Sequence, residues 1–75
     1  MTTEQILLRH RATPFRAFVI FLADGRTMNV PNVECFSLAE DGLSFILFEP
    51  PRQIDIIDPA HIVSIRFYEI GANLR

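Results

Sequence analysis

The sequence reads FRAFVIFLADGRTMNV from Phe15 to Val30, and this stretch gives the clearest indication of the fold. Side chains of a strand alternate between two faces, and from Phe15 to Ala23 both faces are mostly apolar. That composition is typical of a strand covered on both sides. Asp24-Gly25 predicts a two-residue type I′ turn, because glycine tolerates a positive φ. Arg26 to Val30 then returns as the partner strand, and Pro31 ends it or places it at an edge.

Residues 2–11, upstream of this stretch, are predicted to form a short helix. Thr2 and Gln5 have the spacing of a capping box, and Glu4 suits the positive end of a helix. Pro14 disfavours helical geometry at the residue before it, so the helix should end earlier. Because about ten residues cannot hold a helix alone in water, this helix should lie on the rest of the domain.

Downstream of Pro31, turn signals separate four further predicted strands: Val33–Ala39, Leu43–Glu49, Gln53–Ile57 and Ile62–Glu69. Asp58-Pro59-Ala60-His61, before the last strand, predicts a tight turn or a one-turn helix. We therefore expect a mainly β domain at the boundary with α+β, in which a short N-terminal helix precedes the strands. The strands should form a five- to six-stranded, strongly bent antiparallel sheet or a small SH3/Sm-like barrel. The strand pattern fits both the open sheet and the closed barrel.

The chain of 75 residues predicts a single domain (1–75), with a helix at 2–11, a sheet or barrel at 15–69 and a frayed tail at 70–75. Domains of this size are thinly stable and are usually supported by disulfides, a metal or oligomerisation. Cys35 is the sole cysteine and cannot form an intramolecular bridge. Cys35, His10 and His61 also lack the close spacings of zinc ligands, so we expect no metal site and no cofactor. Of the three usual supports for a small domain, oligomerisation remains, so we expect a homo-oligomer.

Composition and charge narrow the classes of partner. Apolar residues make up 49% of the chain, which favours burial of some apolar surface against another subunit. The net charge of −2 argues against broad nucleic-acid binding through phosphate neutralisation. The N-terminus has no signal-peptide pattern, and no run approaches the roughly 18 apolar residues of a membrane span. With its lone cysteine, the chain is expected in the cytoplasm, without membrane association.

Several motifs resemble a group of short bacterial conserved hypothetical proteins. The resemblance rests on Ala12-Thr13-Pro14-Phe15-Arg16, on Asp24-Gly25-Arg26-Thr27 and on Val30-Pro31, and it covers most of the chain. It implies a bacterial protein and carries no activity with it. At Val33 the chain departs from the group, in which proline is common, so the resemblance does not fix the bend after the second strand.

The order of the predicted elements also resembles the Sm-like fold, a small five-stranded barrel that assembles into rings and often binds RNA. Ile54 to Ile65, with the turn at Asp58 to His61, resembles the last two strands of that fold. The Sm motif itself is absent, because Met28-Asn29 falls inside the second strand, with no aspartate at the right distance. The Arg-Gly of the late loop is missing too. The resemblance therefore implies a shape and no RNA-binding residue.

Four arginines form the most distinct charge feature, and they are candidate contacts for an anion or a nucleic acid: Arg9, Arg11, Arg16 and Arg26. Arginine suits multidentate recognition of phosphate. The alternative is favourable charge at the end of a helix, beside a solvated strand edge. We favour this structural alternative.

Asp55 and Asp58 with His61 suggest acid–base chemistry or metal binding. No nucleophile accompanies them, and aspartate before proline is a common turn former, so we favour a structural role. Cys35 lies in an apolar context and is predicted to be a small core residue. We therefore expect no catalytic residue and no enzyme.

Self-association is the function that the sequence favours, through a small non-enzymatic interaction module. Candidate interface residues are Phe18, Ile20, Phe67 and Tyr68. Since Phe67 and Tyr68 are adjacent in a strand, one of the two should be exposed. The alternatives are an Sm-like nucleic-acid-binding protein and, less favoured, a small-ligand-binding domain. The partner, the pathway and the number of subunits stay open.

Overall fold

The computed structural model describes residues 1–68, which form one α-helix, six strands and two 3₁₀ turns. In chain order these are α1 (Thr3–His10), β1 (Phe18–Leu22), β2 (Thr27–Val30), η1 (Val33–Cys35), β3 (Phe36–Leu38), β4 (Phe45–Glu49), β5 (Gln53–Ile57), η2 (Pro59–His61) and β6 (Ile62–Phe67). The predicted mainly β class is therefore confirmed. The predicted tail at 70–75 and the predicted strand end at Glu69 lie outside the described residues.

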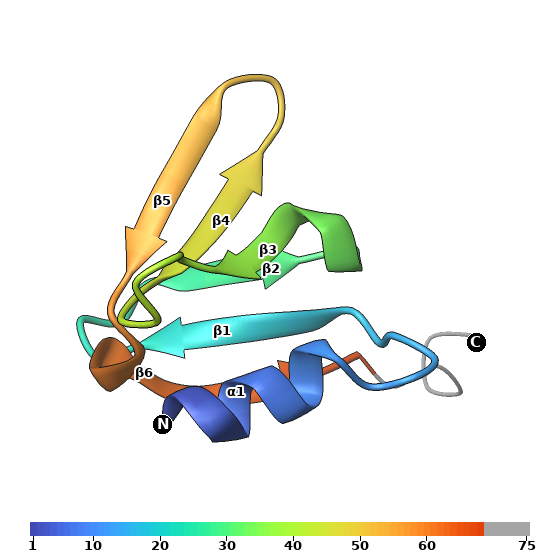
Figure 1. Ribbon diagram of the computed structural model, residues 1–75, viewed down its shortest axis with the longest axis horizontal. Coiled ribbons are helices and arrows are strands. Elements are labelled where there is room, and N and C mark those ends of the chain that lie inside the picture. Colours follow the sequence, from blue (N-terminus) through green and yellow to red (C-terminus); the bar gives the residue numbers. More distant parts are fainter. Residues whose placement is uncertain (69–75) are drawn as a thin grey trace.

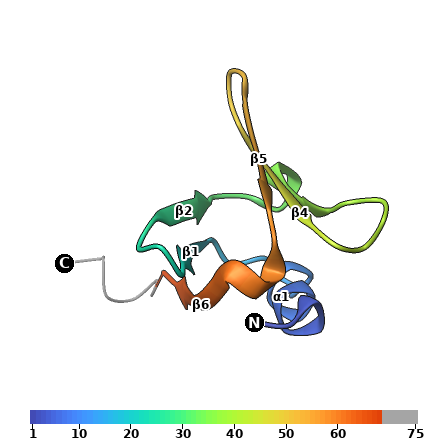
Figure 2. The same cartoon turned by 90° about the vertical axis from the view of Figure 1, so that its left-hand side faces the viewer.

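The strands form two three-stranded antiparallel sheets and no closed barrel within residues 1–68. One sheet has the order β2-β1-β6 and the other the order β3-β4-β5. The chain passes between the sheets twice, through η1 and through η2. Figures 1 and 2 show the β4–β5 hairpin standing up from the first sheet, with α1 at the opposite end of the molecule from the hairpin tip. One face of each sheet therefore packs toward the interior of the domain, and the other face is directed outward.

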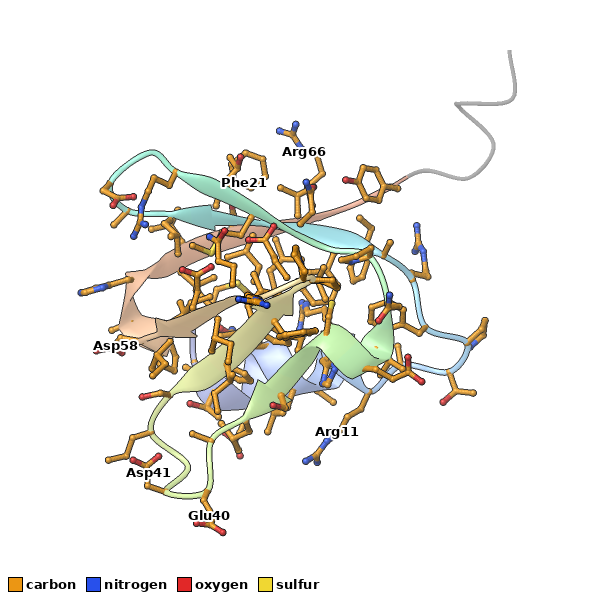
Figure 3. The ribbon with its side chains drawn as sticks, turned by 90° about the horizontal axis from the view of Figure 1, so that it is seen from above. Arg11, Phe21, Glu40, Asp41, Asp58 and Arg66 are labelled. Carbon is orange, nitrogen blue, oxygen red and sulfur yellow. The ribbon has the colours of Figure 1, made fainter. Side chains whose placement is uncertain are left out.

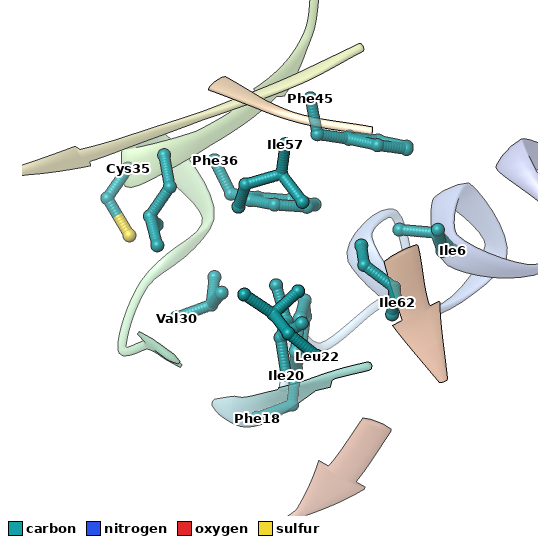
Figure 4. Close-up of a cluster of buried hydrophobic side chains, with 11 residues drawn as sticks. Ile6, Phe18, Ile20, Leu22, Val30, Cys35, Phe36, Phe45, Ile57 and Ile62 are labelled. Carbon is teal, nitrogen blue, oxygen red and sulfur yellow. The ribbon is translucent and has the colours of Figure 1, made fainter. Parts of the chain in front are cut away.

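The core lies between the two sheets and α1 (Figure 4). Its buried residues are Ile6, Phe18, Ile20, Leu22, Val30, Cys35, Phe36, Phe45, Leu47, Ile57 and Ile62. Cys35 is confirmed as a core residue, and its Sγ donates to the carbonyl oxygen of Asn32 at 3.1 Å. The prediction that Phe18 and Ile20 lie at an interface is wrong. Both are 0% exposed, because β1 is the central strand of its sheet and turns them into the domain's own interior.

The hairpin loop that is closed by the backbone bond between Leu22 and Arg26 has three residues, Ala23 to Gly25, rather than the predicted two. Gly25 donates its N–H to the Leu22 carbonyl at 3.0 Å, and Leu22 donates to the Arg26 carbonyl at 2.9 Å. Gly25 has φ +94°, whereas no other residue type has a positive φ within residues 1–68. A type I′ turn needs a positive φ at both central residues, so that prediction is wrong. A three-residue loop needs it only at its last residue.

Most of the predicted strands are shorter in the structure, and β2 begins one residue later, at Thr27. β1 begins at Phe18 rather than Phe15. β4 begins at Phe45 rather than Leu43, because the Asp41 carboxylate accepts the N–H of Leu43 at 2.9 Å and holds that residue in the turn. The start of the predicted strand Val33–Ala39 is η1, where the chain bends from one sheet to the other.

The capping box predicted for α1 is confirmed. The Thr2 hydroxyl accepts the N–H of Gln5 at 3.1 Å, and the Thr2 N–H donates to the Gln5 side chain at 3.0 Å. Ile6 anchors the helix in the core, and the His10 ring contacts the carbonyl oxygen of Val33 through Nε2 at 2.9 Å. No helix in the described part of the chain is long and apolar enough to cross a membrane.

Candidate interaction surfaces

The four arginines predicted as an anion site do not form one cluster. Arg16 precedes β1 and Arg26 follows the loop at its other end, so the whole strand separates them. A five-residue strand is roughly 17 Å long, at about 3.3 Å per residue. Arg26 therefore lies apart from Arg16.

Arg26 is also paired. Its Nε donates to the Asp24 carboxylate at 2.8 Å, and its backbone N–H donates to the same carboxylate at 3.1 Å. These bonds, first of all the one from the backbone N–H, hold the pKa of Asp24 below its ordinary value of 3.8. The pair stabilises the β1–β2 loop and leaves Arg26 little excess charge for an anion.

Arg9, Arg11 and Arg16 lie toward the end of α1 and the start of β1. Arg9 donates to the Gln5 carbonyl of its own helix at 3.0 Å, and Arg11 is the exposed C-cap of α1. The Arg16 guanidinium lies 4.8 Å from the centre of the Phe67 ring and donates to the Tyr68 carbonyl at 3.3 Å. Each arginine thus makes a local structural contact or caps a helix, as in the structural alternative.

The structure brings together three residues for which the sequence favoured a structural role. They line one cleft of about 340 Å³ together with Asp24 and Arg26, and they are Asp55, Asp58 and His61. Asp58 caps η2 by accepting the N–H of Ala60 at 2.9 Å, which is the turn-forming role predicted for it. Asp24 is occupied by Arg26. Within residues 1–68, no three side chains of the metal-ligating types come together as a possible metal site.

The outer face of the β2-β1-β6 sheet is apolar only at its centre. Val19 and Phe21 project there, and the Arg66 guanidinium lies 4.9 Å from the centre of the Phe21 ring (Figure 3). In the register, polar Asn29 stands beside Val19, and Ser64 stands beside Phe21. A long arginine side chain can cover apolar surface while its charge stays in water. This face is therefore suited to solvent.

The outer face of the β3-β4-β5 sheet is different, because no charged side chain projects from its paired positions. The register places Ile46 opposite Ile56 and Phe48 opposite Ile54. Ser37, opposite Ile46 on β3, is the polar member of this face. Ile54 is 61% exposed and Ile56 is 73% exposed. We call Ile46, Phe48, Ile54 and Ile56 the apolar sheet face.

Sequence reasoning missed this surface because β5 directs apolar side chains outward and an acidic side chain inward, the opposite of the usual arrangement. In Gln53–Ile57 the isoleucines Ile54 and Ile56 would ordinarily point inward and Asp55 outward. The structure pairs Asp55 with Leu47, on the inner side, and turns both isoleucines to solvent. The pattern of β5 alone holds no signal for this inversion.

Phe67 and Tyr68 differ in exposure, as strand alternation predicts. Phe67 is half-buried and packs on Phe18, with ring centroids 6.0 Å apart. Tyr68 is exposed, and its hydroxyl donates to the Asn29 side chain at 2.8 Å. Tyr68 and Phe48 both border a groove of about 690 Å³.

No protein-family model, curated protein or solved structure matches this chain.

Proposed function

We propose that this protein is a small, non-enzymatic, cytoplasmic interaction module that self-associates. The observation that carries the proposal is the apolar sheet face, a contiguous set of side chains on two paired strands. Single apolar side chains on a surface are ordinary, whereas a contiguous exposed group marks an interaction site.

Two further features support this function over a catalytic one. In the cleft of about 340 Å³, Asp58 caps η2 and Asp24 pairs with Arg26, so both of these carboxylates already have structural roles. A domain of this size also gains stability when a second copy covers its apolar surface. Cys35 is buried as a free thiol and adds no cross-link.

Size-exclusion chromatography with light scattering and refractive index tests the proposal. The sample is the untagged protein over a range of concentrations, and absorbance at 260 nm is recorded alongside. We expect a particle larger than one chain, whose mass rises with concentration and which carries no excess absorbance at 260 nm. A monodisperse monomer at millimolar concentration would overturn the proposal.

The Sm-like nucleic-acid binder is the alternative. The helix before the strands and the 3₁₀ turn between β5 and β6 support it. Arg9 and Arg11, at the end of α1, are the arginines best placed to meet a phosphate. This function predicts RNA binding that weakens steeply with salt and is reduced in the Arg9→Ala/Arg11→Ala double variant. A flat titration of the wild type at low salt would eliminate it.

A small-ligand-binding domain is the third function. The cleft lined by Asp24, Arg26, Asp55, Asp58 and His61 is its best location. Its volume of about 340 Å³ is at the lower end of ordinary ligand pockets. A thermal-shift screen with a metabolite panel tests this function, and an Arg26→Ala variant should lose any shift that depends on the cleft.

A further inference from the structure

We propose that the apolar sheet face is a homodimer interface, in which the β3-β4-β5 sheets of two copies pack face to face with their β4 strands antiparallel. This inference rests on the proposed self-association and adds the surface, the symmetry and the orientation of the two copies. The four side chains that would form its centre are Ile46, Phe48, Ile54 and Ile56.

The edges of this sheet are less suited to a second copy than its face. β5 is an edge strand with Asp55 at its centre. Two β5 strands paired symmetrically about Asp55 would place the two carboxylates directly opposite each other, which destabilises the pairing. A charged residue that points inward is a common protection of an edge strand. The other edge, β3, has only three residues.

The other large exposed apolar side chains come from separate parts of the described chain: Leu8, Val33, Leu43, Val63 and Tyr68. Leu8 lies on α1, and Val63 lies at the irregularity in the pairing of β6 with β1. Phe21 is covered by Arg66. The apolar sheet face combines four large side chains from neighbouring strands with no charge among them. It is thus the surface that gains most when water is excluded.

The charges at its two ends make this face complementary to itself. Glu40 and Asp41 lie in the turn before β4 (Figure 3). Arg52 lies in the turn after β4. Glu49, also near the hairpin tip, pairs with Gln53 on the inner side of the sheet. In a two-fold dimer both copies use the same surface, so a contact between two different residues occurs twice, once in each direction. Antiparallel β4 strands therefore place Arg52 of each copy toward the acidic turn of the other.

The size of the face predicts a weak dimer. Two strands of five residues and one of three, about 4.8 Å apart, cover at most roughly 14 Å by 17 Å. A stable interface buries about 1,200 Å² or more in total, and this face supplies less. We therefore expect a dissociation constant in the micromolar range or weaker, with dimers that appear as the concentration rises.

Sedimentation equilibrium from micromolar to millimolar protein tests this interface, with interference optics because Tyr68 is the only strong chromophore. Ile56→Arg places a charge at the centre of the face, at a site 73% exposed in the monomer. We expect its dissociation constant to rise by about tenfold or more. Val63→Arg is the matched control, because Val63 is an exposed β-branched strand residue outside the face. The control should dimerise like the wild type.

A milder variant separates loss of the interface from loss of the fold. Ile54→Thr keeps a β-branched residue in β5 and removes apolar surface from the face. It should weaken dimerisation in the same direction as Ile56→Arg, while circular dichroism and the urea midpoint of the dilute monomer stay close to those of the wild type. Dimerisation that is unchanged in both variants would overturn the assignment of this face.

Charge reversal tests the antiparallel orientation. Arg52→Glu alone and Glu40→Arg/Asp41→Arg alone should each weaken dimerisation several-fold at low salt. The combined variant restores opposite charges between the copies and should dimerise nearly as well as the wild type. If the combined variant is weaker than either parent, the two turns do not meet and the orientation is wrong.

The failures of the two proposals are distinguishable. A wild type that stays monomeric throughout overturns self-association and this interface together. If the wild type and Ile56→Arg both dimerise, with equal dissociation constants, self-association stands and only the assigned interface is overturned. A monomeric wild type that binds anionic phospholipid vesicles, and loses binding in Ile56→Arg, would assign the face to a lipid surface instead.

Discussion

Phe36 and Phe45 stack with their ring planes 5° apart and their centroids 4.9 Å apart. Phe36 follows η1 and Phe45 begins β4, so the pair joins the entry into the second sheet to its central strand. Phe18 from the first sheet meets Phe36 edge-on at 5.9 Å. The two sheets are thus connected by successive contacts between these three aromatic rings.

Removal of this stack should cost a large part of the stability. We expect Phe36→Ala to lower the free energy of unfolding by about 3–5 kcal/mol, because it removes a fully buried aromatic ring and leaves a cavity. Urea denaturation of the dilute protein, followed by circular dichroism, measures the loss. Leu43→Ala is the control, because Leu43 is 70% exposed and its truncation should cost little. Equal losses in the two variants would contradict the central place given to the stack.

The capping box at Thr2 should contribute measurably to α1. Thr2→Ala removes the acceptor for the N–H of Gln5, so we expect a loss of about 1 kcal/mol. Thr2→Ser retains a hydroxyl at the cap and should stay within a few tenths of a kcal/mol of the wild type. Thermal and urea denaturation of both variants make the comparison, and an equal loss in the two would argue against the cap.

Gly25 should resist substitution for a reason confined to the backbone. An added Cβ would meet no atom within 4 Å, yet the residue has φ +94°. Gly25→Ala should therefore cost roughly 1–2 kcal/mol through conformational strain alone. Gly25→Asn should cost less, because asparagine enters left-handed conformations more readily. If alanine is as stable as glycine, the loop has another conformation in solution.

The Asp24–Arg26 pair should give the fold a sensitivity to acid. Because the pKa of Asp24 is lowered in the folded chain, its contribution to stability is present above the ordinary value of 3.8. That contribution is lost as the pH falls through the lower, folded pKa. A carboxyl NMR titration should find Asp24 below its value in the unfolded chain. Asp24→Asn should remove this part of the pH dependence, and an Asp24 pKa at or above 3.8 would contradict the assignment.

Local signals in the sequence predicted the elements of the fold well. Thr2 and Gln5 marked the start of α1, and Asp58 before Pro59 marked η2, because these signals act within three residues. The predicted length of the loop at Gly25 was wrong, because the local signal there is ambiguous. A single glycine satisfies both a two-residue and a three-residue hairpin, and the register of the flanking strands decides between them.

The place of the candidate interface residues on β1 depended on contacts that are distant in sequence, and here the prediction failed. β1 is apolar on both faces, so the sequence alone could not tell whether Phe18 and Ile20 face the core or a partner. The sheet partners decide this, since β6 pairs with β1 from the far end of the chain. β5 is a different case, because it pairs with β4 in a local hairpin, and the register of that hairpin turns Asp55 inward and Ile54 and Ile56 outward.

The position of β1 between β2 and β6 also constrains how the protein is made. Phe18 pairs with Phe67, so the first sheet stays incomplete until the segment up to Phe67 has left the ribosome. Until then β1 can pair only with β2, and its buried side chains lack the strand that completes their cover. Closing a contact between distant segments carries a large entropic cost before any native contact offsets it. We therefore expect folding to be cooperative, with the arrival of β6 as its decisive step.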